Sequence, residues 1–331
     1  MTTDGDRPIT QRGWRPDVHR RLCELIASGG DDRAVAVFDF DNTCVLGDIG
    51  EAYGHYLVET MRYRYDLERF WDLVHPDDGR RRLREVTEEA MNTVSGGEDA
   101  FGSEEPAYRR YLAEMMTLYD RRLERAGKRD CYEWAVRLHV GLDEEEMRQW
   151  STAAIRRELQ RTRESVRFSF SDGREIEIQR GIRPFVEIRR LFDALRQVGW
   201  EVWIVSATNE WTVRQFAPVF GVPTDRVLGN RVGVVDGELT DETESPVLFR
   251  EGKVEAIDRR IGTRPDLVVG DAVTDYEMLC CAQKLAVVVD RGDEMLRREA
   301  DDRGWAMQPQ EELTPETVEF APESRAVVEG G

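Results

Sequence analysis

Two aspartates stand two positions apart at the end of an apolar run. The run AVAVFDF, residues 34–40, predicts a strand covered on both faces, and its continuation DFDNT carries Asp39 and Asp41. Burying carboxylates is costly unless cations or hydrogen-bond donors compensate them. An aspartate after a strand also serves as a turn former or helix cap. For this pair alone, the structural and the chemical interpretations are evenly balanced.

Polar side chains also stand at the ends of the later predicted strands or begin the next helix: Ser206 at the end of EVWIVSA with Thr208 and Asn209 after it, Asp271 at the end of PDLVVGD with Asp275 four residues on, and Lys253 in EGKVEA. Taken singly, Ser206 is favoured as a helix cap, Lys253 as a solvated charge, and Asp271 is balanced between turn and site. Their combination favours chemistry, because the carboxyl ends of parallel strands meet at one edge of a sheet.

The chemistry of this set is that of phosphate and a hard cation. Asp39, Asp271 and Asp275 form an oxygen-rich group that suits Mg²⁺, which would also relieve their mutual repulsion. Ser206 and Lys253 supply a hydroxyl and a positive charge for phosphate oxygens. One carboxylate can attack phosphorus to form an aspartyl-phosphate, and a second can move the proton between leaving group and water.

The elements that must position these residues alternate. From Gly181 onward, helix and strand patterns follow one another, which predicts an α/β fold with a parallel sheet flanked by helices. Residues 45–180 differ, with amphipathic helical segments at 49–74, 105–127, 129–140 and 143–165 and a hairpin pattern at 166–178. We therefore expect a core formed by residues 1–44 and 181–307, an inserted helical segment at 45–180, and a loose acidic tail at 308–331.

The motifs DFDNT, the Ser206 strand, Lys253 and GDAVTD resemble, in the same order, the four motifs of the haloacid dehalogenase (HAD) superfamily. The resemblance implies a Rossmann-like core, Mg²⁺ and an aspartyl-phosphate intermediate. It implies that Asp39 is the nucleophile and a metal ligand. It also implies that Asp41 is the general acid and base and gives its backbone carbonyl to the metal. Dehalogenases of this superfamily lack the second aspartate, so Asp41 favours a phosphatase.

The same resemblance extends to binding residues. The phosphoryl group would be held by Ser206, Ala207, Thr208 and Lys253. The metal would be held by Asp271, with support from Asp275 directly or through water. The insertion resembles a C1-type cap of the phosphoserine phosphatase-like branch, and the DNT motif with the large cap and EGK is similar to bacterial phosphorylcholine phosphatases.

Three residues are candidates for reading the substrate. Asp48 falls where phosphoserine phosphatases carry a substrate-reading glutamate, Glu51 follows it, and Asn209 lies beside the Ser206 strand end. The cap segment is rich in aromatic residues, which together with Asp48 and Glu51 form a possible cage for a cationic head group. For any single aromatic residue, however, packing between helices is the favoured interpretation.

Composition excludes several other classes of function. A formal net charge of −19 argues against a nucleic-acid partner. No stretch has the length of a membrane span, and the N-terminus lacks an apolar signal segment, so we expect a cytoplasmic protein. The five cysteines and four histidines form no metal-binding or disulfide pattern.

The sequence thus predicts a Mg²⁺-dependent phosphomonoester hydrolase acting on a small phosphocholine-like or phosphoserine-like metabolite. Two alternatives stay open: a phosphotransferase that passes the phosphoryl group to an acceptor alcohol, and a non-catalytic regulatory member of the fold. The sequence does not predict the substrate or the oligomeric state.

Overall fold

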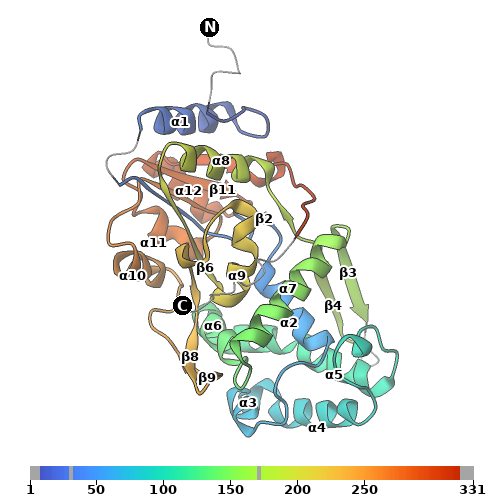
Figure 1. Cartoon of the computed structure of the whole chain (residues 1–331). Coiled ribbons are helices and arrows are strands. Elements are labelled where there is room, and N and C mark those ends of the chain that lie inside the picture. Colours follow the sequence, from blue (N-terminus) through green and yellow to red (C-terminus); the bar gives the residue numbers. More distant parts are fainter. Residues whose placement is uncertain (1–7, 30–32, 170–172, 321–331) are drawn as a thin grey trace, which may run out of the picture.

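A six-stranded parallel sheet forms the centre of the molecule (Figure 1), and the computed structural model describes residues 8–29, 33–169 and 173–320. The sheet order is β12-β11-β10-β1-β6-β7. The strands are β1 (Val35–Phe38), β6 (Glu201–Asn209), β7 (Val227–Asn230), β10 (Leu267–Gly270), β11 (Leu285–Asp290) and β12 (Ala306–Pro309). The predicted α/β class with a parallel sheet is therefore confirmed, and β1 lies between β6 and β10, where ligands of such sheets bind.

Alternation along the strands explains the two helical layers. In β1, Ala36 and Phe38 pack with α1 (Pro16–Ala27), α8 (Val186–Gln197) and α9 (Glu210–Phe216). Val35 and Val37 point to the other face and pack with α10 (Glu251–Arg260), α11 (Tyr276–Leu279) and α12 (Glu294–Arg303). Both faces of the strand are covered, which is why nearly all of its residues are apolar.

A second group of elements leaves the core and returns to it at one place. β2 (Val45–Leu46) pairs with β5 (Arg183–Pro184), so the two ends of the insertion lie side by side. Between them lie α2 (Ile49–Glu59), α3 (Glu68–Leu73), α4 (Arg80–Met91), α5 (Pro106–Met116), α6 (Leu118–Arg137), α7 (Glu144–Gln160), β3 (Glu164–Ser169) and β4 (Glu175–Arg180). We call residues 45–180 the cap segment; in Figure 1 these elements gather below the sheet, away from α1 and α8.

The cap segment has an aromatic core of its own. Tyr, Trp and Phe side chains from α2, α3, α5 and α6 pack together, and the hairpin of β8 (Val232–Val235) and β9 (Glu238–Thr243) closes one side. The backbone of Leu239 exchanges hydrogen bonds with Gly141 and Leu142, which ties that hairpin to the turn between α6 and α7. β3 and β4 pair antiparallel across the span with the hairpin pattern, and residues 170–172 of its turn lie outside the described residues.

Two helical segments expected to be continuous are interrupted. The span 49–74 divides into α2 and α3, because Met61 adopts a left-handed backbone with φ 52°. The span 105–127 divides at Thr117 into α5 and α6, and α6 itself contains a non-helical residue, Gly127, with φ 79° and ψ 171°. Apolar periodicity continues through such breaks, so it does not locate them.

The expectation of a loose tail from residue 308 is wrong for residues 308–320. Gln308 is fully buried, accepts from the amide of Arg15 and donates to the carbonyl of Gly13. Pro315 bridges to the backbone of Phe185, and the rings of Phe320 and Phe216 lie 5.7 Å apart. These contacts hold residues 308–320 against the core despite their polar composition. Residues 321–331 lie outside the described part of the chain.

Candidate active site

Asp39 stands at the carboxyl end of β1 and shares a buried lysine with Asp275. The Lys253 Nζ atom lies 2.6 Å from Asp39 Oδ1 and 2.6 Å from Asp275 Oδ1. Only 1% of the lysine side chain is exposed. Burial acts to lower the pKa of Lys253, but the charges of Asp275 and Asp39 outweigh it and raise that pKa. The lysine that the sequence placed in a helix start is therefore a buried cation between two carboxylates.

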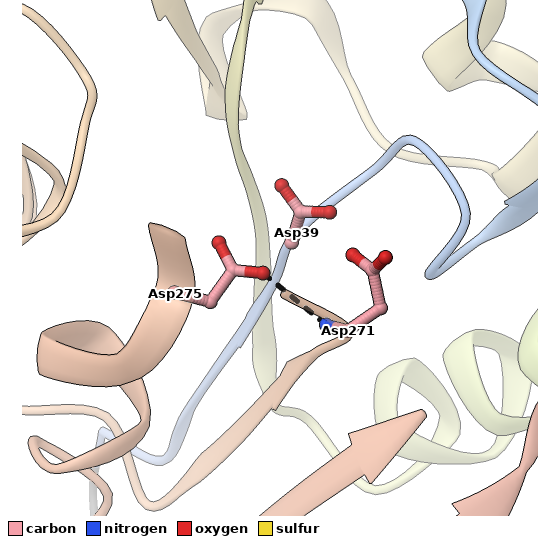
Figure 2. A group of neighbouring side chains, drawn as sticks. All are labelled: Asp39, Asp271 and Asp275. Carbon is pink, nitrogen blue, oxygen red and sulfur yellow. Dashed lines mark hydrogen bonds between the residues drawn. The ribbon is translucent and has the colours of Figure 1, made fainter. Parts of the chain in front are cut away.

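Asp271 joins this group from the end of β10, and Figure 2 shows the three aspartates converging. Oxygen atoms of Asp39, Asp271 and Asp275 all lie within 4.8 Å of one another. The Thr43 hydroxyl lies 3.0 Å from Asp39 Oδ2 and 3.0 Å from Asp271 Oδ1. Because this hydroxyl has one proton, it compensates both carboxylates only by sharing that proton.

The remaining oxygen of Asp271 accepts from Arg291, which follows β11, at 2.8 Å. Asp275 is occupied on both oxygens, since its Oδ2 accepts from the amides of Asp271 and Ala272 at 3.2 Å each. Asp275 thus holds the turn and Lys253 in place, which fits support of a metal more closely than direct ligation. Burial and the charge of Asp39 raise the pKa of Asp275 to about 6, against the lowering effect of Lys253.

Asp41 faces a different set of partners. Its Oδ1 accepts from the amide of Ile49 at 2.6 Å, where α2 begins. Its Oδ2 accepts from the Thr208 hydroxyl at 2.8 Å and lies 3.5 Å from the Ser206 hydroxyl. Burial, followed by the charges of Asp48 and Asp39, raises the pKa of Asp41. Asp41 therefore connects the first strand, the start of the cap segment and the end of β6.

The end of β6, residues 206–209, is held in place by hydrogen bonds. Ser206 is 1% exposed and its hydroxyl accepts from the Thr208 amide at 3.1 Å. Asn230 donates to the carbonyl of Ala207 at 2.6 Å and accepts from the amide of Leu248 at 2.7 Å. The amide side chain of Asn230 therefore holds the segment expected to bind phosphate, and no motif predicted a role for this residue.

Asn209, Asp48 and Glu51 have separate positions. Asn209 is 7% exposed and caps α9 by accepting from the Thr212 amide at 2.9 Å. Asp48 caps α2 by accepting from the Glu51 amide at 2.8 Å. Helix capping alone would account for both residues without a role in substrate recognition. However, Asn209, Asp48 and Glu51 all border a cavity.

The donor set fits a divalent cation. Four carboxylates meet only two basic groups: Asp39, Asp41, Asp271 and Asp275 against Lys253 and Arg291. If all four carboxylates are ionised, two negative charges have no basic partner in this group. Burial, followed by the charges of Asp39 and Asp275, raises the pKa of Asp271. A hard dication bound by carboxylate oxygens would balance them.

Comparison with known proteins decides the family. A sequence profile of the haloacid dehalogenase-like hydrolase family matches residues 103–279, more than half of the chain. The chain belongs to the haloacid dehalogenase-like hydrolase family. The matched span contains Ser206, Lys253, Asp271 and Asp275, whereas Asp39 and Asp41 precede it. No curated protein matches the chain in sequence.

Two solved structures of proteins of unknown function share the fold. A protein of unknown function from Anaerococcus prevotii aligns with TM-score 0.77 at 22% identity, over 91% of this chain and 94% of that one. A protein of unknown function from Bordetella pertussis aligns with TM-score 0.53 at 18% identity, over 84% and 99%. A substrate-bound phosphoserine phosphatase aligns with TM-score 0.44 at 17% identity, over 85% and 95%.

Within this HAD hydrolase, the sequence located the strand-end residues and missed their supports. Thr43 lies inside the recognised DFDNT motif, four residues after Asp39, and that spacing was its only signal. Arg291 follows a strand neighbouring β10, so its position at the same sheet edge was available from the strand order alone. Asn230 ends β7 and carried no signal beyond that.

Proposed function

We propose that this HAD hydrolase is a Mg²⁺-dependent phosphomonoesterase that acts on a small phosphorylated metabolite through an aspartyl-phosphate on Asp39. One observation supports it above the others: Asp39 lies at a sheet edge between Lys253 and Thr43, with Asp41 two residues away on the side of the cap segment. Nucleophilic attack and proton transfer need two carboxylates that reach the same substrate but have different surroundings. Asp39 and Asp41 meet this requirement.

Asp39 and Asp271 would hold the cation, with Asp275 in support and the backbone carbonyl of Asp41 as a further oxygen. Mg²⁺ would supply charge to the phosphoryl oxygens as they become more negative. Lys253 adds a positive charge at the same place, and Ser206, Ala207 and Thr208 at the end of β6 would supply hydrogen-bond donors. The chain's own groups therefore bind and orient the phosphoryl group.

In the first step, a carboxylate oxygen of Asp39 forms a bond to phosphorus while the bond from phosphorus to the ester oxygen breaks. Protonated Asp41 gives its proton to the departing oxygen, so the alcohol leaves neutral. Ile49 and Thr208 donate hydrogen bonds to the two oxygens of Asp41 and fix its orientation in this step.

In the second step, the Asp41 carboxylate takes a proton from water as the water oxygen bonds to phosphorus. The bond from phosphorus to Asp39 breaks, and the products are inorganic phosphate and the starting carboxylate. A phosphotransferase would use the same first step and an alcohol in place of water, and product analysis with added alcohols separates the two.

The test uses purified protein and p-nitrophenyl phosphate. We expect Mg²⁺-dependent hydrolysis that exhaustive chelation abolishes and added Mg²⁺ restores. We expect Asp39→Asn and Asp41→Asn to lose nearly all activity, because the first lacks the nucleophile and the second lacks the acid. Activity that survives chelation would contradict the metal, and an active, folded Asp39→Asn variant would contradict the nucleophile.

For the substrate, we propose a phosphocholine-like or phosphoserine-like metabolite. The support is a cavity of about 380 Å³ beside Thr208 that is bordered by Asp48 and Glu51 and by aromatic rings of the cap segment. Its volume suits a small metabolite.

Among the described residues, no helix is long and apolar enough to cross a membrane.

A further inference from the structure

The cavity lies where the alcohol part of a phosphate ester would extend. Ala207, Thr208 and Asn209 form its edge on the core side, and the cap segment provides the rest. Thr208 donates to Asp41, the residue proposed to protonate the departing oxygen. The chemistry of the cavity wall therefore selects the alcohol that the enzyme releases.

Besides Glu177, three carboxylates of the cap segment line this cavity: Asp48, Glu51 and Asp120. The charge of Asp48, followed by burial, raises the pKa of Glu51 to about 7, and Asp120 adds to the effect. These groups are therefore close enough to repel one another. Glu177 also borders the cavity, but it pairs with Arg167 on the exposed face of the hairpin.

The cavity offers hydrogen-bond acceptors and no fixed positive charge. Among its described lining residues none is a lysine or arginine. Burial lowers the pKa of His55 to about 3 and that of His139 to about 4, so both rings are neutral at pH 7. His139 is 4% exposed, and its Nδ1 contacts the carbonyl of Val136 at 2.9 Å. Its Nε2 is left as an acceptor with no partner among the described residues.

Aromatic rings complete the wall. Tyr119 and Tyr132 lie near the carboxylates, since burial and then the charge of Asp48 raise the pKa of Tyr132, with Asp39 contributing next. Both rings line the cavity. Aromatic faces attract cations, and most strongly in enclosed sites.

On the basis of the proposed phosphatase function, we infer that the substrate is a phosphomonoester whose alcohol part carries a positively charged amine and no second anionic group. The amine finds carboxylates, ring faces and a free imidazole acceptor. A carboxylate such as that of phosphoserine would face Asp48, Glu51 and Asp120 without a basic partner in the wall. Phosphocholine and phosphoethanolamine therefore fit, and phosphoserine does not.

Two arginines that are not among the lining residues of the cavity, Arg163 and Arg291, could bind the carboxylate of phosphoserine if they turned toward it. Arg163 and Arg291 both act to lower the pKa of Glu51, so they lie near it. Arg163 donates to the carbonyl of Gly181 at 3.0 Å, and Arg291 pairs with Asp271 at 2.8 Å. A preference for phosphoserine over phosphoethanolamine would show that these arginines turn to the substrate, and it would overturn the inference.

The first experiment compares kcat/KM for four phosphate esters on the Mg²⁺-loaded full chain. They are phosphocholine, phosphoethanolamine, phosphoserine and the neutral isostere of phosphocholine in which a tert-butyl group replaces trimethylammonium. We expect each cationic ester to exceed the neutral isostere and phosphoserine by about tenfold or more. Equal values for phosphocholine and its isostere would overturn the inference.

Variants test whether the wall is responsible. Glu51→Gln and Asp120→Asn remove charge at similar volume, and we expect the ratio of phosphocholine to its neutral isostere to fall several-fold in each. Glu85→Gln is the matched control, because Glu85 lies on α4, exposed, near Arg81 and outside the cavity. An unchanged ratio in both cavity variants would contradict the assignment.

A binding measurement separates this inference from the proposed function. Calorimetric titration with choline and with its neutral isostere alcohol requires no turnover. Preferential binding of choline without any hydrolysis of p-nitrophenyl phosphate would support the cavity assignment and refute the phosphatase. Hydrolysis of p-nitrophenyl phosphate without preference for choline would refute the cavity assignment and leave the phosphatase standing.

Discussion

Replacement of Lys253 by methionine tests whether the buried lysine compensates the catalytic carboxylates. The side chain is 1% exposed and forms two contacts of 2.6 Å, to Asp39 and to Asp275. Methionine has a similar length and no charge, so the variant leaves two buried carboxylates without their shared cation. We expect loss of both stability and hydrolysis.

The magnitude follows from burial. Removal of one partner of a buried ion pair costs about 3–5 kcal/mol, because the other charge stays buried and uncompensated. Lys284 provides a matched control, since its ammonium lies 3.0 Å from Asp266 but its side chain is 35% exposed. An ion pair in contact with solvent is worth about 1 kcal/mol or less. Lys253→Met should therefore be several times more destabilising than Lys284→Met.

The assay is urea unfolding in a chelating buffer at pH 7, followed by circular dichroism, with the free energy of unfolding compared among wild type and the two variants. Added Mg²⁺ should stabilise Lys253→Met more than wild type, because the variant carries more uncompensated negative charge. Equal destabilisation by the two substitutions, or an unchanged free energy for Lys253→Met, would refute the argument from burial.

Three further predictions concern the supports of the site and the cap segment. Thr43→Val should raise the Mg²⁺ concentration needed for half-maximal hydrolysis by about 10–100-fold, whereas Thr87→Val, which removes a buried hydroxyl in α4, should not; equal effects would contradict a role for Thr43 at the metal. Gly50→Ala should lower kcat by displacing Thr208, because a Cβ at Gly50 would lie 2.5 Å from the Thr208 hydroxyl; an unchanged kcat would show that Thr208 is free to shift. The unfolded state takes up a proton near pH 6.5 that folded His139 resists until about pH 4, so stability should fall as pH drops through that window. His139→Gln should flatten the fall by up to about 1.4 kcal/mol per pH unit in unfolding experiments at pH 7 to 4.5, and parallel curves would exclude this histidine.

The meeting of Asp39, Asp271 and Lys253 at one place was predictable from the sequence. Parallel strands place their carboxyl ends together, and β1 and β10 are neighbours, so Asp39 and Asp271 meet at one edge. Lys253, 214 positions from Asp39, reaches the same edge from the start of α10. The change from alternating to helical patterns predicted an insertion at residues 45–180; β2 and β5 pair close to its two ends, and the division of the chain into a core and a cap segment stays a prediction. Their roles in catalysis stay a prediction until variants are assayed.

The supports of the site were not predictable in the same way. Thr43 and Asn230 act through single hydrogen bonds across the fold, and short polar side chains of this kind occur in every loop. The break after α2 depends on the left-handed backbone of Met61, a residue with no tendency toward it. The packing of residues 308–320 depends on partners just before α1 and in α9 that composition does not reveal.

The central claim is that the phosphoryl group passes through Asp39. Acid quenching of the wild-type enzyme during turnover of p-nitrophenyl phosphate, followed by peptide mass spectrometry, measures this directly. We predict one added phosphoryl group on the peptide that contains Asp39, absent without substrate and absent in Asp39→Asn. Turnover with no phosphorylated Asp39 peptide at any quench time, together with hydrolysis by Asp39→Asn, would contradict the account.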